Sequence, residues 1–203
     1  ILPRVPAAWK GVSQYEFEES GDFEGLTYTG ESLYILRSDG RLSECKNFLN
    51  DDAKFIHHQL NLKTANNEGL CYDQKNNRIL IAAKSKPINH NEKEKRYIYS
   101  YNIKTEELLE KPVYSINTNE IQKFASKYDI IQTQTTSKGK IKPFNFRPAS
   151  LAIHPITDEI YIISAADKLI LIMNRNGEMV HIERLNDELF LKAEGITFIP
   201  DGT

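Results

Sequence analysis

Cysteine is scarce in this sequence, and long apolar runs are absent. The 203 residues include two cysteines, Cys45 and Cys71. A disulfide between neighbouring sheets would need a separation that the sequence does not define, and buried free thiols are common, so we expect both to be unpaired. No apolar run approaches the roughly 20 residues that cross a bilayer. We therefore expect no transmembrane segment. The first residues lack a signal-peptide pattern, so any secretion signal would have been removed.

A strong excess of charge of either sign is also missing. Lys and Arg number 26 against 28 Asp and Glu, giving a formal net charge of -2. Such a balance provides no strong field toward nucleic acid or anionic lipid, and we expect neither partner. Hydrophobic residues make up 40% and charged residues 27%, a composition typical of a chain that folds.

The short motifs of common enzymes are missing as well. The sequence contains no G-x-S-x-G elbow, H-E-x-x-H helix, Walker loop, dinucleotide fingerprint or paired C-x-x-C. The corresponding catalytic classes therefore have no sequence support.

What the sequence does contain is a repeated phrase. FEGLTY at 23–28, NEGLCY at 67–72 and AEGITF at 193–198 share one pattern, and PASLAI at 148–153 is a degenerate copy. The equivalent second positions are 24, 68, 149 and 194, which are 44, 81 and 45 residues apart. Two intervals match the period of about 40 to 50 residues typical of propeller blades with four strands each.

The 81-residue interval is longer than one blade. RYIYSYNI (96–103) and LLEKPVYSI (108–116) are strand-like and complete a blade. Beyond them Ile121, Phe124 and Ala125 recur on one face of a helix. We interpret the interval as one blade plus a helical insertion, with a skipped weak blade as the alternative.

The predicted fold is therefore all-β: a β-propeller of four-stranded blades with one helical insertion. VSQYEF, before the first phrase, reads as the outer strand of a preceding blade. Ring closure usually takes about 4 to 8 blades, so we expect a single domain over 1–203 that is incomplete at both ends. The predicted segments are blades at 22–62, 66–117 and 147–187, a helical insertion and loop at 118–146, and the start of another blade at 192–203.

Together the longer phrases resemble a known family. SGDFEGLTYTGESLYILRSDGRL, NNEGLCYDQKNNRILIAAK, RPASLAIHPITDEIYIISAADKL and AEGITFIPDG are similar to the SdiA-regulated family of bacterial β-propellers, especially its Bacteroidetes members. The resemblance runs from Gly21 to the end. It implies a six-bladed propeller of largely unassigned activity, exported to the periplasm or cell surface, with lipid anchoring through a removed N-terminus as one route. An earlier blade with an EISG-like phrase and a strand beyond PDG, both usual in the family, are absent here.

The repeated glutamates are the candidate metal ligands. The first strand of each propeller blade lines the central channel, so Glu24, Glu68 and Glu194 are expected to converge. Clustered carboxylates repel one another unless a cation or hydrogen-bond donors hold them ionised, and Ca2+ takes such oxygen ligands. Ala149 contributes no charge. The alternative is a structural corner, in which each carboxylate accepts backbone N–H groups and each following glycine permits close approach or a positive φ.

Other polar residues are candidates for ligand binding. Asn67 could add a neutral oxygen ligand or serve only turn chemistry. His154 could act as a base or ligand, or cap the turn before Pro155. Arg147 and Lys84, at blade edges, could bind an anionic substrate or pair with the acidic channel. Each residue keeps both interpretations from sequence alone.

Three functions follow from this pattern. The leading expectation is an exported propeller that binds a small molecule or a protein on one face, with an axial Ca2+ site. The main alternative is a metal-dependent hydrolase of the lactonase or phosphoesterase type, in which channel carboxylates hold a metal that activates water. A structural scaffold is the third, and it requires that each glutamate be tied only to backbone amides.

Overall fold

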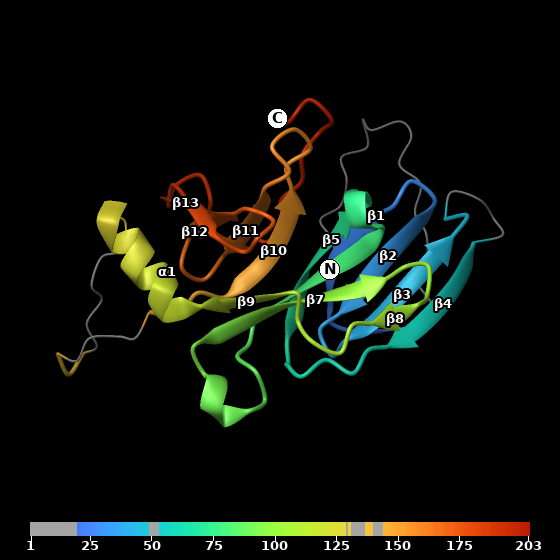
Figure 1. Ribbon diagram of the computed structural model, residues 1–203, viewed down its shortest axis with the longest axis horizontal. Coiled ribbons are helices and arrows are strands. Elements are labelled where there is room, and N and C mark those ends of the chain that lie inside the picture. Colours follow the sequence, from blue (N-terminus) through green and yellow to red (C-terminus); the bar gives the residue numbers. More distant parts are fainter. Residues whose placement is uncertain (1–19, 49–52, 129, 131–136, 140–143) are drawn as a thin grey trace.

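Most of the chain folds into three antiparallel β-sheets (Figure 1). A computed structural model describes residues 20–48, 53–128, 130, 137–139 and 144–203. The predicted strand VSQYEF and part of the predicted insertion loop lie outside these residues. The described part contains no helix long and apolar enough to span a membrane.

The three sheets follow one another along the chain. The first contains β1 (Phe23–Tyr28), β2 (Ser32–Arg37), β3 (Arg41–Lys46) and β4 (Lys54–Gln59). The second contains β5 (Asn67–Asp73), β6 (Arg78–Ala83), β7 (Lys95–Asn102), β8 (Glu107–Leu108) and β9 (Tyr114–Asn117). The third contains β10 (Pro148–Ile153), β11 (Ile160–Ser164), β12 (Leu169–Met173) and β13 (Met179–Arg184).

Hairpin chemistry explains why neighbouring strands pair in chain order. Gly40 and Gly177 have φ of 90° and 85°, and each follows an Asp or Asn in the turn before the third or fourth strand of its sheet. Positive φ costs little at glycine, which makes such dipeptides favourable in tight turns. In β2 the buried positions alternate, with Tyr34 and Leu36 almost fully covered. Both dipeptides lie in hairpin turns, between β2 and β3 and between β12 and β13.

The second sheet departs from a simple four-stranded blade at its outer edge. β9 pairs with Lys95–Ile98 of β7, while the short β8 pairs with Tyr101 and Asn102. The outer strand is thus split into two pieces along one edge. Pro112 lies in the connecting loop, where the missing N–H of proline costs no ladder bond.

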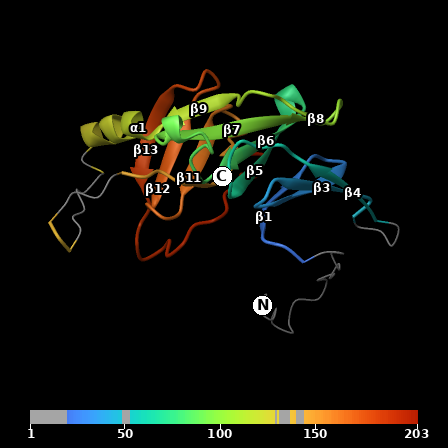
Figure 2. The same ribbon diagram turned by 90° about the horizontal axis from the view of Figure 1, so that it is seen from below.

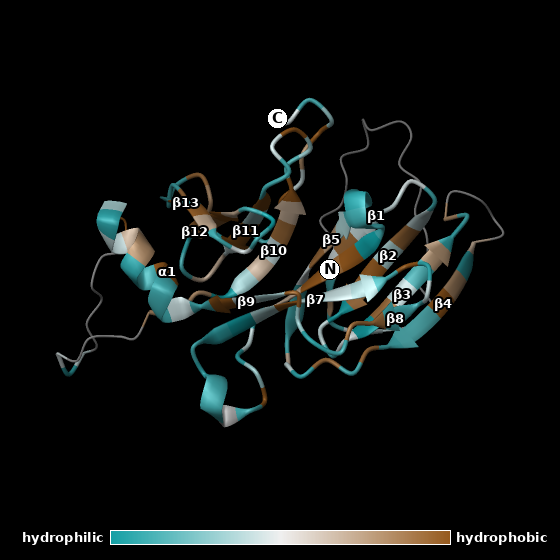
Figure 3. Cartoon of the chain, viewed as in Figure 1, coloured by the Kyte–Doolittle hydropathy of each residue, from teal (hydrophilic) through white to brown (hydrophobic). Residues whose placement is uncertain are grey.

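The inner strands of the sheets lie next to one another. β5 lies between β1 and β10 in both views (Figures 1 and 2), and it contacts each of them. Tyr34, Leu36 and Ile81 belong to the apolar cluster between the first and second sheets, whereas Leu80 and Leu151 belong to that between the second and third. Hydrophobic residues accordingly concentrate on the strands (Figure 3). These sheets do not close a ring within the described part of the chain.

One α-helix follows the second sheet. α1 (Thr118–Ala125) buries Ile121 and Ala125 against the cluster shared by the second and third sheets. The short 3-10 turns are η1 (Gln74–Asn76), η2 (His90–Glu92) and η3 (Ser126–Tyr128). The all-β propeller class with one helix is confirmed by this arrangement together with the structural similarities given below.

The C-terminal segment behaves differently from the other copies of the repeat. Residues 192–203 form no strand, although Phe198 packs on His154 and Tyr161 with ring centroids 4.8 and 4.9 Å apart. That this segment begins a further blade stays a prediction. Cys45 and Cys71 are buried and unpaired, as expected.

Candidate functional site

The repeated phrase forms the same β-bulge in three sheets. Phe23 pairs with Arg37 and Gly25 with Leu36, so Glu24 between them has no partner in the β1–β2 ladder. The β5–β6 and β10–β11 ladders shift in the same way at Glu68 and Ala149. A bulge bends its strand and re-aims a side chain. The structure therefore explains why one position of the repeat stands apart from regular pairing.

The glycines after Glu24 and Glu68 let neighbouring inner strands approach closely. A Cβ atom added to Gly25 would lie 2.7 Å from Leu70 Cβ and 2.8 Å from the Glu68 carbonyl oxygen. A Cβ atom on Gly69 would lie 2.7 Å from Leu151 Cδ2. Neither glycine has a positive φ. Close approach, rather than unusual backbone geometry, accounts for glycine at positions 25 and 69.

The side chains at the fourth position of each phrase also lie close together. Leu26, Leu70, Leu151 and Ile196 occupy equivalent places in the four phrases, and all of them line one small cavity of about 280 Å³. The C-terminal copy thus reaches the inner strands although it forms no strand itself. The repeat brings residues from across the whole chain to one place.

Charged side chains lie together around the bulges. Glu68 is 6% exposed, and its Oε1 lies 2.5 Å from Lys84 Nζ. Glu194 Oε1 lies 2.6 Å from Lys192 Nζ. Glu194 has the largest effect in raising the pKa of Lys192, and the negative charges of Glu68 and Glu24 raise it by smaller amounts. All three predicted glutamates therefore act on shared lysines.

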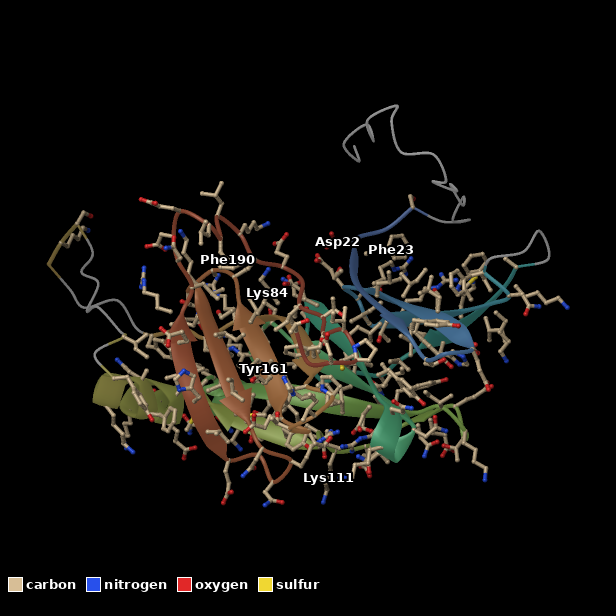
Figure 4. The ribbon with its side chains drawn as sticks, turned by 90° about the horizontal axis from the view of Figure 1, so that it is seen from above. Asp22, Phe23, Lys84, Lys111, Tyr161 and Phe190 are labelled. Atoms are coloured by element: carbon tan, nitrogen blue, oxygen red, sulfur yellow. The ribbon has the colours of Figure 1, made fainter. Side chains whose placement is uncertain are left out.

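Glu24 is the least neutralised of the three. Burial raises its pKa, and the charges of Glu68 and Asp22 raise it further, while Lys84 opposes them. We call Asp22, Glu24, Glu68, Lys84, Lys192 and Glu194 the rim cluster. Figure 4 shows Asp22 and Lys84 in the upper half of the view and Lys111 at the bottom. With four carboxylates and two ammonium groups, this cluster has a formal excess of two negative charges.

The rim cluster supplies the oxygen ligands that a hard cation prefers, but its side chains do not form a complete coordination site. Among the residues that the structure describes, no group of three or more histidine, cysteine, aspartate or glutamate side chains is arranged to hold a metal ion. Lys84 already neutralises Glu68. This contact matches one of the two interpretations of Lys84 from sequence, namely pairing with the acidic channel. Since a lysine contacts Glu68 and another contacts Glu194, the pure scaffold with backbone amides as their only partners does not describe this site.

Asn67 connects the first and second sheets. It is 0% exposed, its Oδ1 accepts a hydrogen bond from Thr64 Oγ1 at 2.8 Å, and its Nδ2 donates to the Ser38 carbonyl at 3.1 Å. Its backbone N–H also donates to that carbonyl, at 3.0 Å. With both amide atoms engaged inside the chain, Asn67 holds the start of β5 in place next to Glu68.

His154 caps the turn after β10. Its Nδ1 accepts from the backbone N–H groups of Ile156 and Thr157 at 3.3 and 3.1 Å, and Nε2 lies 3.2 Å from the Gly202 carbonyl. Nε2 therefore carries the proton and donates it to that carbonyl. This arrangement matches the capping interpretation, because both ring nitrogens are already used.

Arg147 is the residue just before β10. Its backbone N–H donates to Ser164 Oγ at 2.9 Å, while the exposed side chain lines a cavity of about 860 Å³ that Lys84 also lines. Of the sequence-based candidates, Glu24, Glu68 and Glu194 thus share one site, and Arg147 belongs to its neighbour.

Two members of the rim cluster were missed from sequence. Asp22 and Lys192 each lie two residues before a repeated glutamate, at positions 24 and 194. A count of charges flanking each phrase, rather than within it, would have found both.

Comparisons with known proteins support the propeller fold. A streptogramin B lyase structure is similar, with a TM-score of 0.52 at 15% identity over 93% of this chain and 49% of its own. A structure of a protein of unknown function from Bacteroides caccae gives 0.53 at 11% identity over 94% and 54%. The chain spans about half the length of both. At such identities the likeness concerns the fold alone.

No curated protein matched the chain. The family model described as SdiA-regulated, by contrast, matches residues 10–203, which include all three sheets and every member of the rim cluster. The chain therefore belongs to the SdiA-regulated family.

Proposed function

We propose that the protein is a binding module whose rim cluster holds Ca2+ and, around it, a small molecule or protein partner on the same face. One observation carries the proposal: Glu24 and Glu68, at equivalent bulge positions, lie within electrostatic reach of each other in a cluster with a formal excess of two negative charges. A divalent cation would relieve that repulsion.

The donors fit the chemistry of calcium, a hard ion that accepts carboxylate, carbonyl and water oxygens. Glu24, Glu68 and Glu194 would supply the carboxylates, and water or carbonyl oxygens the remaining ligands. Calcium must compete with Lys84 for Glu68, because that ammonium now neutralises the carboxylate. Bound Ca2+ would give a partner's oxygen atoms an electrostatic anchor.

Calorimetric titration with Ca2+ tests the site directly. We expect the protein to bind Ca2+, and the Glu68→Gln and Glu24→Gln variants to bind at least about tenfold more weakly, since each loses a charged oxygen ligand worth about 1.5 kcal/mol or more. Lys84→Met should bind more tightly, because it removes the competing cation. Circular dichroism would establish that each variant is folded.

The matched control is Glu183→Gln. Its side chain is 60% exposed in β13, paired with His181 rather than with the rim cluster. The control should bind Ca2+ as the parent does. No heat at millimolar Ca2+, or equal weakening in Glu68→Gln and Glu183→Gln, would refute the proposed metal site.

We further propose an extracytoplasmic location. Competition from Lys84 implies weak affinity, and calcium sites of extracellular modules work at roughly 0.1 to 1 mM. Fractionation of the native cells, followed by immunodetection, should place the protein in the periplasm or at the cell surface. Recovery in the cytoplasmic fraction alone would contradict this.

A further inference from the structure

A second, positively charged cavity adjoins the rim cluster. It has a volume of about 860 Å³ and lies between the loop that joins β6 to β7, the first residues of α1 and the segment that leads into β10. The charged residues that line it are Lys84, Lys86, Lys93, Glu94, Arg96 and Arg147. This volume falls within the range of about 300 to 1,000 Å³ typical of small-molecule sites.

Most of these positive charges have no carboxylate partner. Lys84 pairs with Glu68, but among the described residues no ion pair is formed by Lys86, Lys93 or Arg147. With Arg96 and Glu94 included, the lining carries four uncompensated cations and one anion, a formal excess of three positive charges. Asp167 lies outside the lining and interacts with both Arg147 and Arg96, and counting its charge leaves an excess of two.

Arg96 is a buried lining residue whose guanidinium is held by hydrogen bonds. It is 5% exposed, its Nε donates to the Phe146 carbonyl at 2.8 Å, and its Nη1 donates to the carbonyls of Lys93 and Lys95 at 3.1 and 2.7 Å. Its Nη2 donates to Asn145 Oδ1. These bonds join β7 to the segment before β10, so the two walls of the cavity are held at a defined spacing.

The neighbouring guanidinium groups repel each other. Burial lowers the pKa of Arg96, and the charge of Arg147 lowers it further. Arg96 donates its hydrogen bonds to neutral oxygen atoms, whereas the guanidinium of Arg147 forms no hydrogen bond to the described residues. The charge of Asp167 offsets part of this repulsion. A bound anion would offset more of it and could accept two hydrogen bonds from Arg147.

The start of α1 adds to the same field. Thr118 and Asn119, the first residues of the helix, line the cavity. The N-terminal end of a helix carries partial positive charge and favours anions. Two features therefore favour the same ligand charge: the uncompensated cations, which include the buried Arg96, and the helix start.

We infer that this cavity binds a small polyanion bearing carboxylate or phosphate groups, with Arg147 as its bidentate contact and Lys86 and Lys93 as secondary contacts. The inference does not depend on the Ca2+ site, since the two sites share only Lys84. It assigns to this face of the protein an anionic small molecule rather than a nucleic acid, because the cavity volume of about 860 Å³ suits a small molecule.

Calorimetry with citrate and with pyrophosphate in metal-free buffer tests the inference. We expect at least one to bind, and Arg147→Met to weaken that binding by about tenfold or more, as expected for a charge-assisted bidentate contact. Lys93→Met should have a smaller effect, and added salt should weaken binding. Preference for citrate would assign carboxylate ligands to the cavity. Preference for pyrophosphate would assign phosphate ligands to it.

Lys111→Met is the matched control, because Lys111 is an exposed lysine outside the cavity lining and lies well away from Lys84 in Figure 4. It removes one positive charge without touching the cavity and should bind as the parent does. Absence of binding by both anions at millimolar concentration, or equal weakening in Arg147→Met and Lys111→Met, would overturn the inference. Failure of Ca2+ binding would leave it standing.

Discussion

Replacement of Arg175 by methionine should lower the free energy of unfolding by about 3 kcal/mol, at the low end of the cost of breaking a buried ion pair. Arg175, between β12 and β13, donates from Nη1 and Nη2 to both carboxylate oxygens of Asp73, each at 3.0 Å, and Asp73 is 0% exposed. Removal of the guanidinium leaves a buried carboxylate with fewer donors. Arg78 and Asn76 still contact it, which limits the loss.

Denaturant unfolding measures this effect, and Arg184→Met is the control. Arg184 pairs with Asp187, but the two side chains are 40% and 51% exposed, so the loss should stay below about 1 kcal/mol. For a chain of this size the Arg175 variant should also melt about 6 to 12 °C lower. Equal destabilisation by the two substitutions would show that the contact between the second and third sheets contributes little.

Acid should remove the advantage of Arg175. Burial alone would raise the pKa of Asp73, but hydrogen bonds from Asn76, Arg78 and Arg175 outweigh it, and the pKa is lowered. A lowered folded-state pKa stabilises the protein above the unfolded pKa of about 4, and this contribution is lost as the pH falls through the folded value. The stability difference between parent and variant should therefore be constant near neutrality and shrink below about pH 4.

This network could not have been foreseen from sequence. Asp73 and Arg175 are 102 residues apart, and charge pairing at that separation depends on how two sheets stack. Neither residue belongs to the repeated phrase. In contrast, the sheets themselves were predictable. Alternating apolar residues and turn dipeptides determine strands and hairpins over a few residues, and the phrases recur at intervals that match the length of a blade.

The candidate site was predictable in part. Repetition of Glu-Gly was enough to group Glu24, Glu68 and Glu194, since equivalent positions of adjacent blades converge. Their pairing with Lys84 and Lys192 was not, because it depends on side-chain conformations that a spacing pattern does not specify. The bulge was missed as well: a strand-like phrase carries no local sign that one of its residues lacks a ladder partner.

Introduction of a methyl group at Gly25 should destabilise the protein by about 2–3 kcal/mol, the upper part of the usual cost of overpacking. The new Cβ would lie 2.7 Å from Leu70 Cβ and 2.8 Å from the Glu68 carbonyl oxygen. The Glu68 carbonyl oxygen is a backbone atom, and Leu70 Cβ is bonded directly to the backbone, so neither can turn away. The strands β1 and β5 must therefore separate to admit the methyl group. Denaturant unfolding of Gly25→Ala measures the cost.

Gly195→Ala provides the matched control within the same repeat. Gly195 follows Glu194 as Gly25 follows Glu24, but an added Cβ there meets no atom within 4 Å, and the residue has no positive φ. The substitution should change stability by less than about 0.5 kcal/mol. If both variants lose equal stability, glycine serves this phrase through backbone freedom rather than close approach. If only Gly25→Ala is destabilised, the spacing of the inner strands requires glycine, and the same spacing brings the neighbouring glutamates together.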